Sequence, residues 1–491
     1  MSSTQILLTI ATYFAVLVII SFVVGRKADS STFFRGNRSS PWYIVAFGMI
    51  GASLSGVTFI SVPGAVEAGS MNYFQVVLGY IVGYAVIGLI LMPLYYRMNL
   101  TSIYSYLGDR YGSAAQYTGS SFFLLSRIVG ASFRLYLVAG VLQTFVFDAM
   151  GIAFWQTVTF TVVLIWLYTF RSGIKTIVWT DTLQTLFMLI AVGVAIYYVS
   201  DSLDLNGIGG IISFVSESEY SQIFFWDDWK SDQFFIKQFL AGAFIAIVMT
   251  GLDQDMMQKN LTCRSLGDAQ KNIFWFTIVL TIVNLVFLAL GVLLTAFAKA
   301  EFLTATKDQL FPAVAMDNGL GIGLGLVFIL GLVAAAYSSA DSALTSLTTS
   351  FSVDIVKLEK NFAEQKQQQL RKLFHVGFSI VLILVIVGFE YIIQDASVIN
   401  KLFVFAGYTY GPLLGMFGFG ILTKVKVNHK LIPIIAIASP FVTYAISYLA
   451  ETQANFKFGF FILILNGAIT VAGLWIGSWF TQQEDLTANT D

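Results

Sequence analysis

The chain has 491 residues, of which 57% are hydrophobic, 15% aromatic and only 11% charged. Because a soluble domain carries about 25% charged residues, most of this surface cannot face water, and we expect an integral membrane protein with many helices. The net charge of −1 argues against nucleic-acid binding, and a single cysteine with two histidines excludes a disulfide scaffold and a zinc or iron–sulfur centre.

Thirteen apolar stretches in the sequence are candidates to cross a bilayer as helices, which takes about 20 residues each. No basic region precedes the first stretch and no small-residue cleavage site follows it, so we expect a retained helix rather than a signal peptide. The pattern predicts one transmembrane domain over residues 1–480, followed by a polar cytoplasmic tail at 481–491. In chain order the stretches are 5–24, 42–66, 74–96, 117–147, 152–170, 177–200, 234–258, 273–298, 320–353, 373–393, 399–422, 431–450 and 458–480.

The loops between these stretches differ in their content of lysine and arginine. Nineteen of the 27 basic residues, Lys259 among them, lie in alternate loops, and five lie in the opposite set. Because basic loops stay on the cytoplasmic side, we expect the N-terminus outside and the C-terminal tail inside, in a plasma or inner membrane. The acidic loop 201–233 then lies outside.

The second stretch contains a polar, glycine-rich segment at residues 48–58. Three glycines and three hydroxyl side chains within eleven residues weaken the helix there. Carbonyls freed by a helix break inside a membrane must bond protein, water or a ligand, and a cation meets that need. Packing of small residues against another helix is the alternative interpretation.

The ninth stretch carries a second polar cluster. Ser338, Asp341, Ser342 and Thr345 are spaced three, four and seven residues from the first, which places them on one helix face, and Ser339 flanks that face. Hydroxyl oxygens with one carboxylate suit a hard cation, which prefers oxygen ligands. Serines alone also bond carbonyls of the preceding turn, but a mid-span aspartate needs a further reason.

Charged residues in other stretches form a third group. Arg127 and Arg134 are two helical turns apart on one face of the fourth stretch. Either they pair with buried carboxylates, or one of them receives an anionic substrate. The carboxylates available for such pairs include Asp181, Asp253 and Asp341. Asp253 and Asp255, near the inner end of the seventh stretch, are equally consistent with a gate or a helix cap.

Five segments together make the sequence similar to the sodium/solute symporter family, whose members carry sugars, proline, sialic acid, iodide or monocarboxylates. The similarity covers nearly the whole chain, and the segments occur in the family's order. They are 101–112, 173–181, 338–339, 354–357 and 411–415.

The resemblance implies an all-α fold with a LeuT-type core of two inverted five-helix repeats, over about residues 42–422. The helices at 5–24, 431–450 and 458–480 would then be peripheral. In such folds the first helix of each repeat is broken near the membrane midplane. The glycine-rich segment 48–58 fits one break, and Gly242 and Gly251 give a weaker signal for the other.

The resemblance also implies sodium sites. The shared site would use backbone carbonyls of Gly51, Leu54 and Ala335 with the side chains of Ser338 and Ser339. Family members with a second sodium have an aspartate at the position of Asp181 and hydroxyls of the serine-rich helix, which here implies Asp181, Ser338 and Ser342. Asp341 stands where the family often has serine or alanine, and it either strengthens this second site, replaces it or forms a salt bridge. The count of one or two sodium ions stays open.

Substrate contacts follow by the same resemblance. They would come from the first break, the third stretch and the arginines of the fourth: Ser53, Ser55, Thr58, Phe74, Gln75, Arg127 and Arg134. In the sialic-acid branch an arginine aligned with Arg127 meets the substrate carboxylate. Val57-Thr58 replaces the acidic and amide pair of the sugar branch, which disfavours a galactose-type substrate.

We therefore expect a monomeric, sodium-coupled symporter that takes up a small organic solute by alternating access. An anionic solute, such as a sugar acid or carboxylate, is the first expectation, and a neutral sugar or amino acid is the alternative. A sodium-responsive sensor or channel is a remote alternative. An enzyme is not expected, because neither histidine lies mid-span and no nucleophile–base pair appears. The expected partners are sodium, the substrate and the lipid bilayer, without nucleic acid.

Overall fold

The computed structural model describes residues 3–24, 33–34, 38–170, 173–316, 320–393 and 398–488. Every apolar stretch predicted above contains a helix, and the described residues contain no strand beyond one isolated bridge between Ser40 and Cys263. The last helix continues into the predicted tail as far as Ala488, and residues 489–491 lie outside the described part.

The first half of the bundle runs from α1 to α12. Its helices are α1 (Ser3–Val24), α3 (Trp42–Ser53), α4 (Gly56–Gly64), α5 (Val66–Gly69), α6 (Tyr73–Val86), α7 (Met92–Arg97), α8 (Ser105–Tyr111), α9 (Ser113–Leu142), α10 (Phe154–Thr169), α11 (Ile174–Ser202) and α12 (Gly207–Glu217).

The second half runs from α13 to α22. Its helices are α13 (Phe235–Ala246), α14 (Gln254–Asn260), α15 (Leu266–Ala300), α16 (Leu310–Met316), α17 (Ile322–Ser350), α18 (Leu358–Asn361), α19 (Glu364–Ile392), α20 (Val398–Leu422), α21 (Leu431–Ala454) and α22 (Ile462–Ala488). Short π-helical segments continue α6, α9, α13 and α17 at η2 (Ile87–Leu91), η3 (Gln143–Phe147), η6 (Ile247–Gly251) and η8 (Phe351–Ile355).

The number of membrane spans is lower than the predicted thirteen when only helices long enough to cross a bilayer are counted. The described residues contain 10 helices long and apolar enough to cross a membrane, or up to 12 if each of two bent pairs is one span. The helix that makes the difference is α10, which has 16 residues and so falls short of the about 20 that a straight span needs. The protein is thus an all-helical, multi-pass membrane protein with about ten to twelve apolar spans.

Two spans are broken in the middle. The axes of α3 and α4 differ by 55°, and those of α13–η6 and α14 by 69°. The first break, at Leu54 and Ser55, lies inside the glycine-rich segment 48–58 and so confirms the predicted interruption. At the second break the side chain of Asp253 accepts hydrogen bonds from the amides of Asp255 (2.9 Å) and Met256 (3.3 Å), which caps α14.

Close packing explains one glycine at the first break. The amide of Gly51 donates to the hydroxyl of Thr185 in α11 at 3.0 Å. A Cβ on Gly51 would collide with that hydroxyl, so only glycine allows α3 and α11 to approach this closely. The amide of Leu54 then ends α3 by donating to Ile50 O (2.8 Å), and Ser55 O accepts from Phe59 in α4 (3.0 Å).

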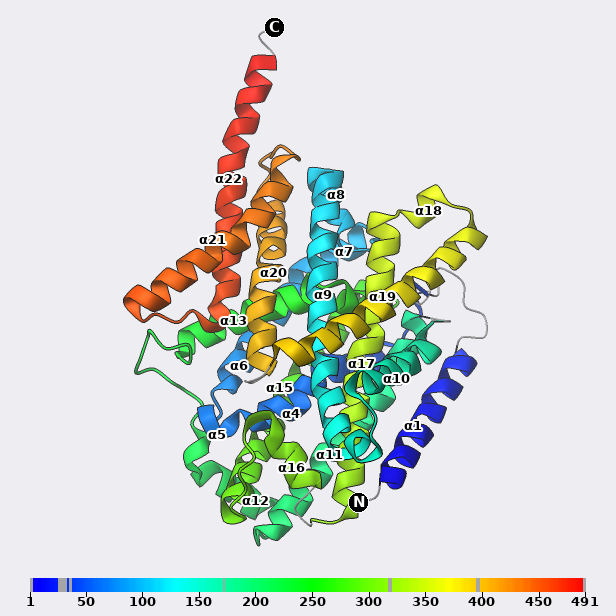
Figure 1. Ribbon diagram of the computed structural model, residues 1–491. Coiled ribbons are helices and arrows are strands. Elements are labelled where there is room, and N and C mark those ends of the chain that lie inside the picture. Colours follow the sequence, from blue (N-terminus) through cyan, green and yellow to red (C-terminus); the bar gives the residue numbers. More distant parts are fainter. Residues whose placement is uncertain are drawn as a thin grey trace.

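Helix α17 lies at the centre of the bundle and packs against α11, α9 and α4. From Gly331 to Ser350 each of its residues is buried. Figure 1 shows α1 at one edge of the bundle and α21 and α22 at another. The start of α1 and the end of α22 lie at opposite ends of the bundle, with α8 and α18 at the end where α22 finishes (Figure 1).

Large apolar side chains remain exposed on the outer helices. Examples are Ile19 (60% exposed) on α1, Ile282 (57%) on α15 and Phe441 (72%) on α21. Exposing such a surface to water has a high free-energy cost, whereas contact with lipid chains has none. The exposed apolar side chains therefore form the surface that meets the membrane.

Candidate functional site

A small cavity of about 70 Å³, partly open to solvent, lies beside the first helix break. Residues of the first break, of α6, α9, α15 and α20, and of the second broken span line it together. The polar members are Ser53, Ser55, Thr58, Tyr73, Tyr80, Tyr84, Arg127, Arg134, Thr250 and Asn284.

Five of the seven predicted substrate residues line this cavity: Ser53, Ser55, Thr58, Arg127 and Arg134. The other two, Phe74 and Gln75, are not among the lining residues. Gln75 is fully buried, and its amide group donates to Gln233 O (3.0 Å) and accepts from the amide of Phe225 (3.2 Å). Gln75 therefore holds the last part of the long loop 201–233 against the bundle.

Three tyrosines of the cavity wall were missed by the sequence analysis. Tyr73, Tyr80 and Tyr84 fall on one face of α6, and the hydroxyls of Tyr73 and Tyr80 lie 2.9 Å apart. The sequence pattern that could have identified them is their spacing of seven and eleven residues, which places them on one helix face. Aromatic residues at helical spacing are also typical of a packed core, so the pattern alone does not indicate a binding site.

Arg127 is occupied by carboxylates of the chain itself. Its guanidinium forms a close ion pair with Asp255 and lies 3.9 Å from Asp253 Oδ2. Asp253 also accepts a short hydrogen bond from Tyr410 in α20. All of these side chains are buried, so the ion pairs of Arg127 are shielded from water and tie α9 to α14.

Arg134 stands in a different electrostatic situation in the same cavity wall. It is 8% exposed and forms no ion pair with any carboxylate in the part of the chain that the structure describes. Its buried Nε likewise lacks a hydrogen-bond partner there. A buried cation without a direct ion pair is unfavourable, and an anion in the cavity would compensate it.

The predicted shared sodium site lies where α3 ends and α17 passes. Gly51 and Leu54 belong to the end of α3, where a helix leaves carbonyls without intrahelical partners. Ala335, Ser338 and Ser339 are buried in α17. The hydroxyl of Ser338 donates to Asp181 Oδ1 at 2.6 Å, and the hydroxyl of Ser339 has no hydrogen-bond partner among the described residues.

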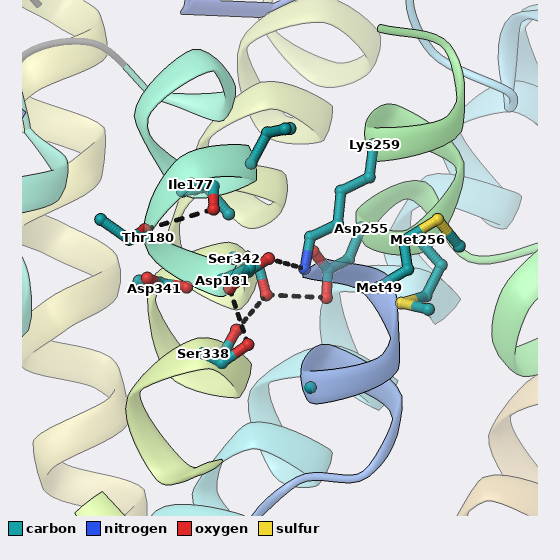
Figure 2. Close-up of polar contacts among 12 residues, drawn as sticks. Met49, Ile177, Thr180, Asp181, Asp255, Met256, Lys259, Ser338, Asp341 and Ser342 are labelled. Atoms are coloured by element: carbon teal, nitrogen blue, oxygen red, sulfur yellow. Dashed lines mark hydrogen bonds and ion pairs between the residues drawn. The ribbon is translucent and has the colours of Figure 1, made fainter. Parts of the chain in front are cut away.

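The predicted second sodium site contains a charged group that the sequence analysis placed elsewhere. Lys259 was counted with the cytoplasmic loops, and this placement was wrong: it lies in α14 with 1% of its side chain exposed. Its ammonium forms an ion pair with Asp181 Oδ2 at 2.7 Å. Figure 2 shows the lysine side chain extending from α14 toward Asp181 and Ser342. The spacing of four residues from Asp255 was the available sign that Lys259 continues a helix.

The remaining members of this cluster have separate partners. Ser342 donates to Ser338 O (2.8 Å) and to Asp255 Oδ2 (3.3 Å). Asp341 Oδ2 accepts from the hydroxyl of Tyr168 at 2.9 Å, whereas its Oδ1 is buried without a hydrogen-bond partner in the described ranges. Asp341 is therefore not in a salt bridge with either arginine of α9, which was one of its predicted roles.

Comparisons with known proteins agree with this architecture. The family model of the sodium:solute symporter family matches residues 33–430. The chain is 24% identical to the sodium/sialic acid symporter NanT of Aliivibrio fischeri, over 86% of this chain and 84% of the relative. It is 25% identical to sodium-coupled monocarboxylate transporter 1 of Xenopus laevis, over 83% of this chain and 67% of the relative.

Solved structures show the same fold. A sodium-coupled sialic acid symporter in a substrate-bound, outward-open state superposes with a TM-score of 0.82, at 20% identity, over 97% of this chain and 98% of the other. Mhp1, a nucleobase-cation-symport-1 family transporter in a closed conformation, superposes with a TM-score of 0.56 at 15% identity, over 92% and 95% of the two chains.

Proposed function

The chain belongs to the sodium:solute symporter family, and from this membership we propose that it couples sodium entry to the uptake of a small organic anion. It is a sodium-coupled membrane transporter and not an enzyme. A sugar acid or a short carboxylate is the substrate class that we favour. The observation that carries this choice is Arg134, which lines the cavity without an internal carboxylate partner.

The two arginines of α9 have different roles in this proposal. Arg127 holds α9 to α14 through Asp255 and Asp253, so its charge is already compensated. Arg134 is free to receive the substrate, because a guanidinium offers two parallel donors to a carboxylate. The relatives named for sialic acid and for monocarboxylates carry anions, which supports the same assignment.

Sodium binding is proposed at the first break, between α3 and α17. The carbonyls of Gly51, Leu54 and Ala335 and the hydroxyls of Ser338 and Ser339 would supply five oxygen ligands, which suit a hard cation. The buried Ser339 hydroxyl without a partner supports this assignment. A sodium ion here would hold the broken helix against α17 and so preorganise Ser53, Ser55 and Thr58 for substrate.

Sodium and substrate would then raise each other's affinity by the same factor, as linkage requires. The cavity and the ion site share the α3–α4 break. One movement of this region can therefore close the outer path after sodium and substrate have both bound. Opening the inner path would release both to the cytoplasm, which is alternating access in the sense of a symporter.

The membrane topology belongs to the same proposal. The start of α1 and the end of α22 lie at opposite ends of the bundle (Figure 1), which supports an odd number of crossings. Thirteen crossings result when α10 and both bent pairs cross the membrane. We keep the N-terminus outside, the C-terminus in the cytoplasm, a single domain over residues 1–480 with a core at about 42–422, and a monomeric transport unit.

The test is a thermal-shift screen of the purified protein against sugar acids, short carboxylates, neutral sugars and amino acids, in sodium and in potassium. The compounds that stabilise only in sodium are then offered to proteoliposomes. We expect saturable, sodium-dependent uptake of an anion. Uptake of neutral solutes alone would refute the anion assignment, and stabilisation or uptake that is equal in potassium would refute sodium coupling.

A further inference from the structure

The cluster around Asp181 already contains a cation of the protein. Both carboxylate oxygens of Asp181 are engaged, since Oδ1 accepts from Ser338 at 2.6 Å and Oδ2 pairs with Lys259 Nζ at 2.7 Å. Asp181 is fully buried and the lysine side chain is 1% exposed. This pair is therefore an interior feature and not a surface salt bridge.

The Lys259 ammonium lies where three helices meet. Asp181 lies in α11, Ser338 and Ser342 lie in α17, and Lys259 reaches them from α14, so the charge joins three helices. Carboxylate and hydroxyl oxygens that converge in a buried cluster are the ligand set of a hard cation. Figure 2 shows the lysine nitrogen among these oxygens.

We infer that the Lys259 ammonium is a tethered cation that takes the place of a second sodium ion at Asp181, so that the transporter binds one sodium. The inference rests on the proposed sodium symport. The ammonium alone would repel a sodium ion about 4 Å away by about 4 kcal/mol at an effective dielectric constant of about 20, which is about 1,000-fold in binding, and the Asp181 carboxylate that would offset this repulsion is already paired with the lysine. Of the two predicted ligand sets, the one left to sodium is then that of Gly51, Leu54, Ala335, Ser338 and Ser339, which shares Ser338 with the Asp181 cluster but does not include the carboxylate that pairs with Lys259.

Binding one sodium ion instead of two changes how much substrate the transporter can accumulate. One sodium carried with a monovalent anion moves no net charge, so membrane voltage contributes nothing to accumulation. A tenfold sodium gradient then supports only about tenfold accumulation of the anion. A second sodium would add both the voltage and another gradient factor.

The experiment is to count bound sodium on the detergent-purified, full-length protein with radioactive ²²Na⁺, which needs no substrate. We expect one sodium per wild-type protein and two per Lys259→Met protein, because the methionine leaves the oxygens of Asp181, Ser338 and Ser342 to the ion. Lys259→Arg, which keeps the charge, and Lys271→Met, which removes an exposed lysine at the start of α15, are matched controls that should stay at one.

Each outcome decides a separate question. Two sodium ions on the wild type would overturn the tethered-cation inference and leave sodium symport standing, whereas none would overturn sodium symport itself. A folded Lys259→Met protein that still binds one ion would also overturn the inference. If Lys259→Met does not fold, the wild-type count and a Hill coefficient near 1 for sodium-induced thermal stabilisation of wild type and Lys259→Arg carry the test.

Discussion

Replacing Arg134 by methionine would remove the one guanidinium in the cavity that has no carboxylate partner among the described residues, while keeping much of its apolar volume. Two charge-assisted hydrogen bonds to a substrate carboxylate would be lost. Each such bond is worth about 1.5–3 kcal/mol, so a conservative total is about 3 kcal/mol, or about 150-fold in affinity. Arg134→Lys keeps the charge but loses the forked geometry, and we expect a loss of about tenfold.

The matched control is Arg127, on the same helix face two turns away. Arg127→Met would leave Asp255 buried without its counter-charge, which destabilises a protein by about 3–5 kcal/mol. We therefore expect a lower unfolding temperature without sodium or substrate, and no selective effect on anions. Removal of Arg134 should not have this cost, since it breaks no internal ion pair.

The assay compares an anion found in the screen with its neutral amide analogue. Binding is followed by sodium-dependent thermal shift and uptake in proteoliposomes, for wild type and for the variants at positions 134 and 127. Arg134→Met should lose the anion and not the amide. Unchanged anion affinity in Arg134→Met, together with selective loss of the anion in Arg127→Lys, would refute the assignment and return the substrate contact to Arg127.

Two further substitutions test the ion site and the helix break. Ser339→Ala removes a buried hydroxyl that has no protein partner among the described residues. We expect the sodium concentration for half-maximal uptake to rise at least tenfold, while the unfolding temperature in sodium-free buffer stays unchanged. An unchanged sodium dependence in both Ser339→Ala and Ser338→Ala would refute the ion assignment. Gly51→Ala places a methyl group against Thr185, so we expect a loss of about 1–3 kcal/mol in stability, measured as a lower unfolding temperature. Adding Thr185→Ala to the same protein should recover part of this loss. An unaltered unfolding temperature in Gly51→Ala would show that α3 and α11 separate at little cost.

The positions of most helices could be predicted from the chain alone. Inside a membrane the backbone must satisfy its own hydrogen bonds, so an apolar stretch of sufficient length becomes a helix wherever it stands. For the same reason the glycines and hydroxyls at 48–58 indicated a break, and α3 does end at Ser53. The uncertain element is α10, because length is the only local criterion and its 16 residues fall below it.

The partners of the charged residues were decided by the tertiary structure. Arg127 with Asp255 and Lys259 with Asp181 are separated by 128 and 78 residues in the sequence, the differences of their residue numbers, and no local pattern ranks one acid above another. Lys259 shows the difference most clearly. The count of basic residues in loops placed it with the cytoplasmic lysines, because a hydropathy scale assigns a cost to every charged side chain inside the membrane. Only the packing of α14 beside α11 and α17 brings Asp181 of α11 close enough to offset the cost of burying the lysine, since the energy of a charge depends on what surrounds it in three dimensions.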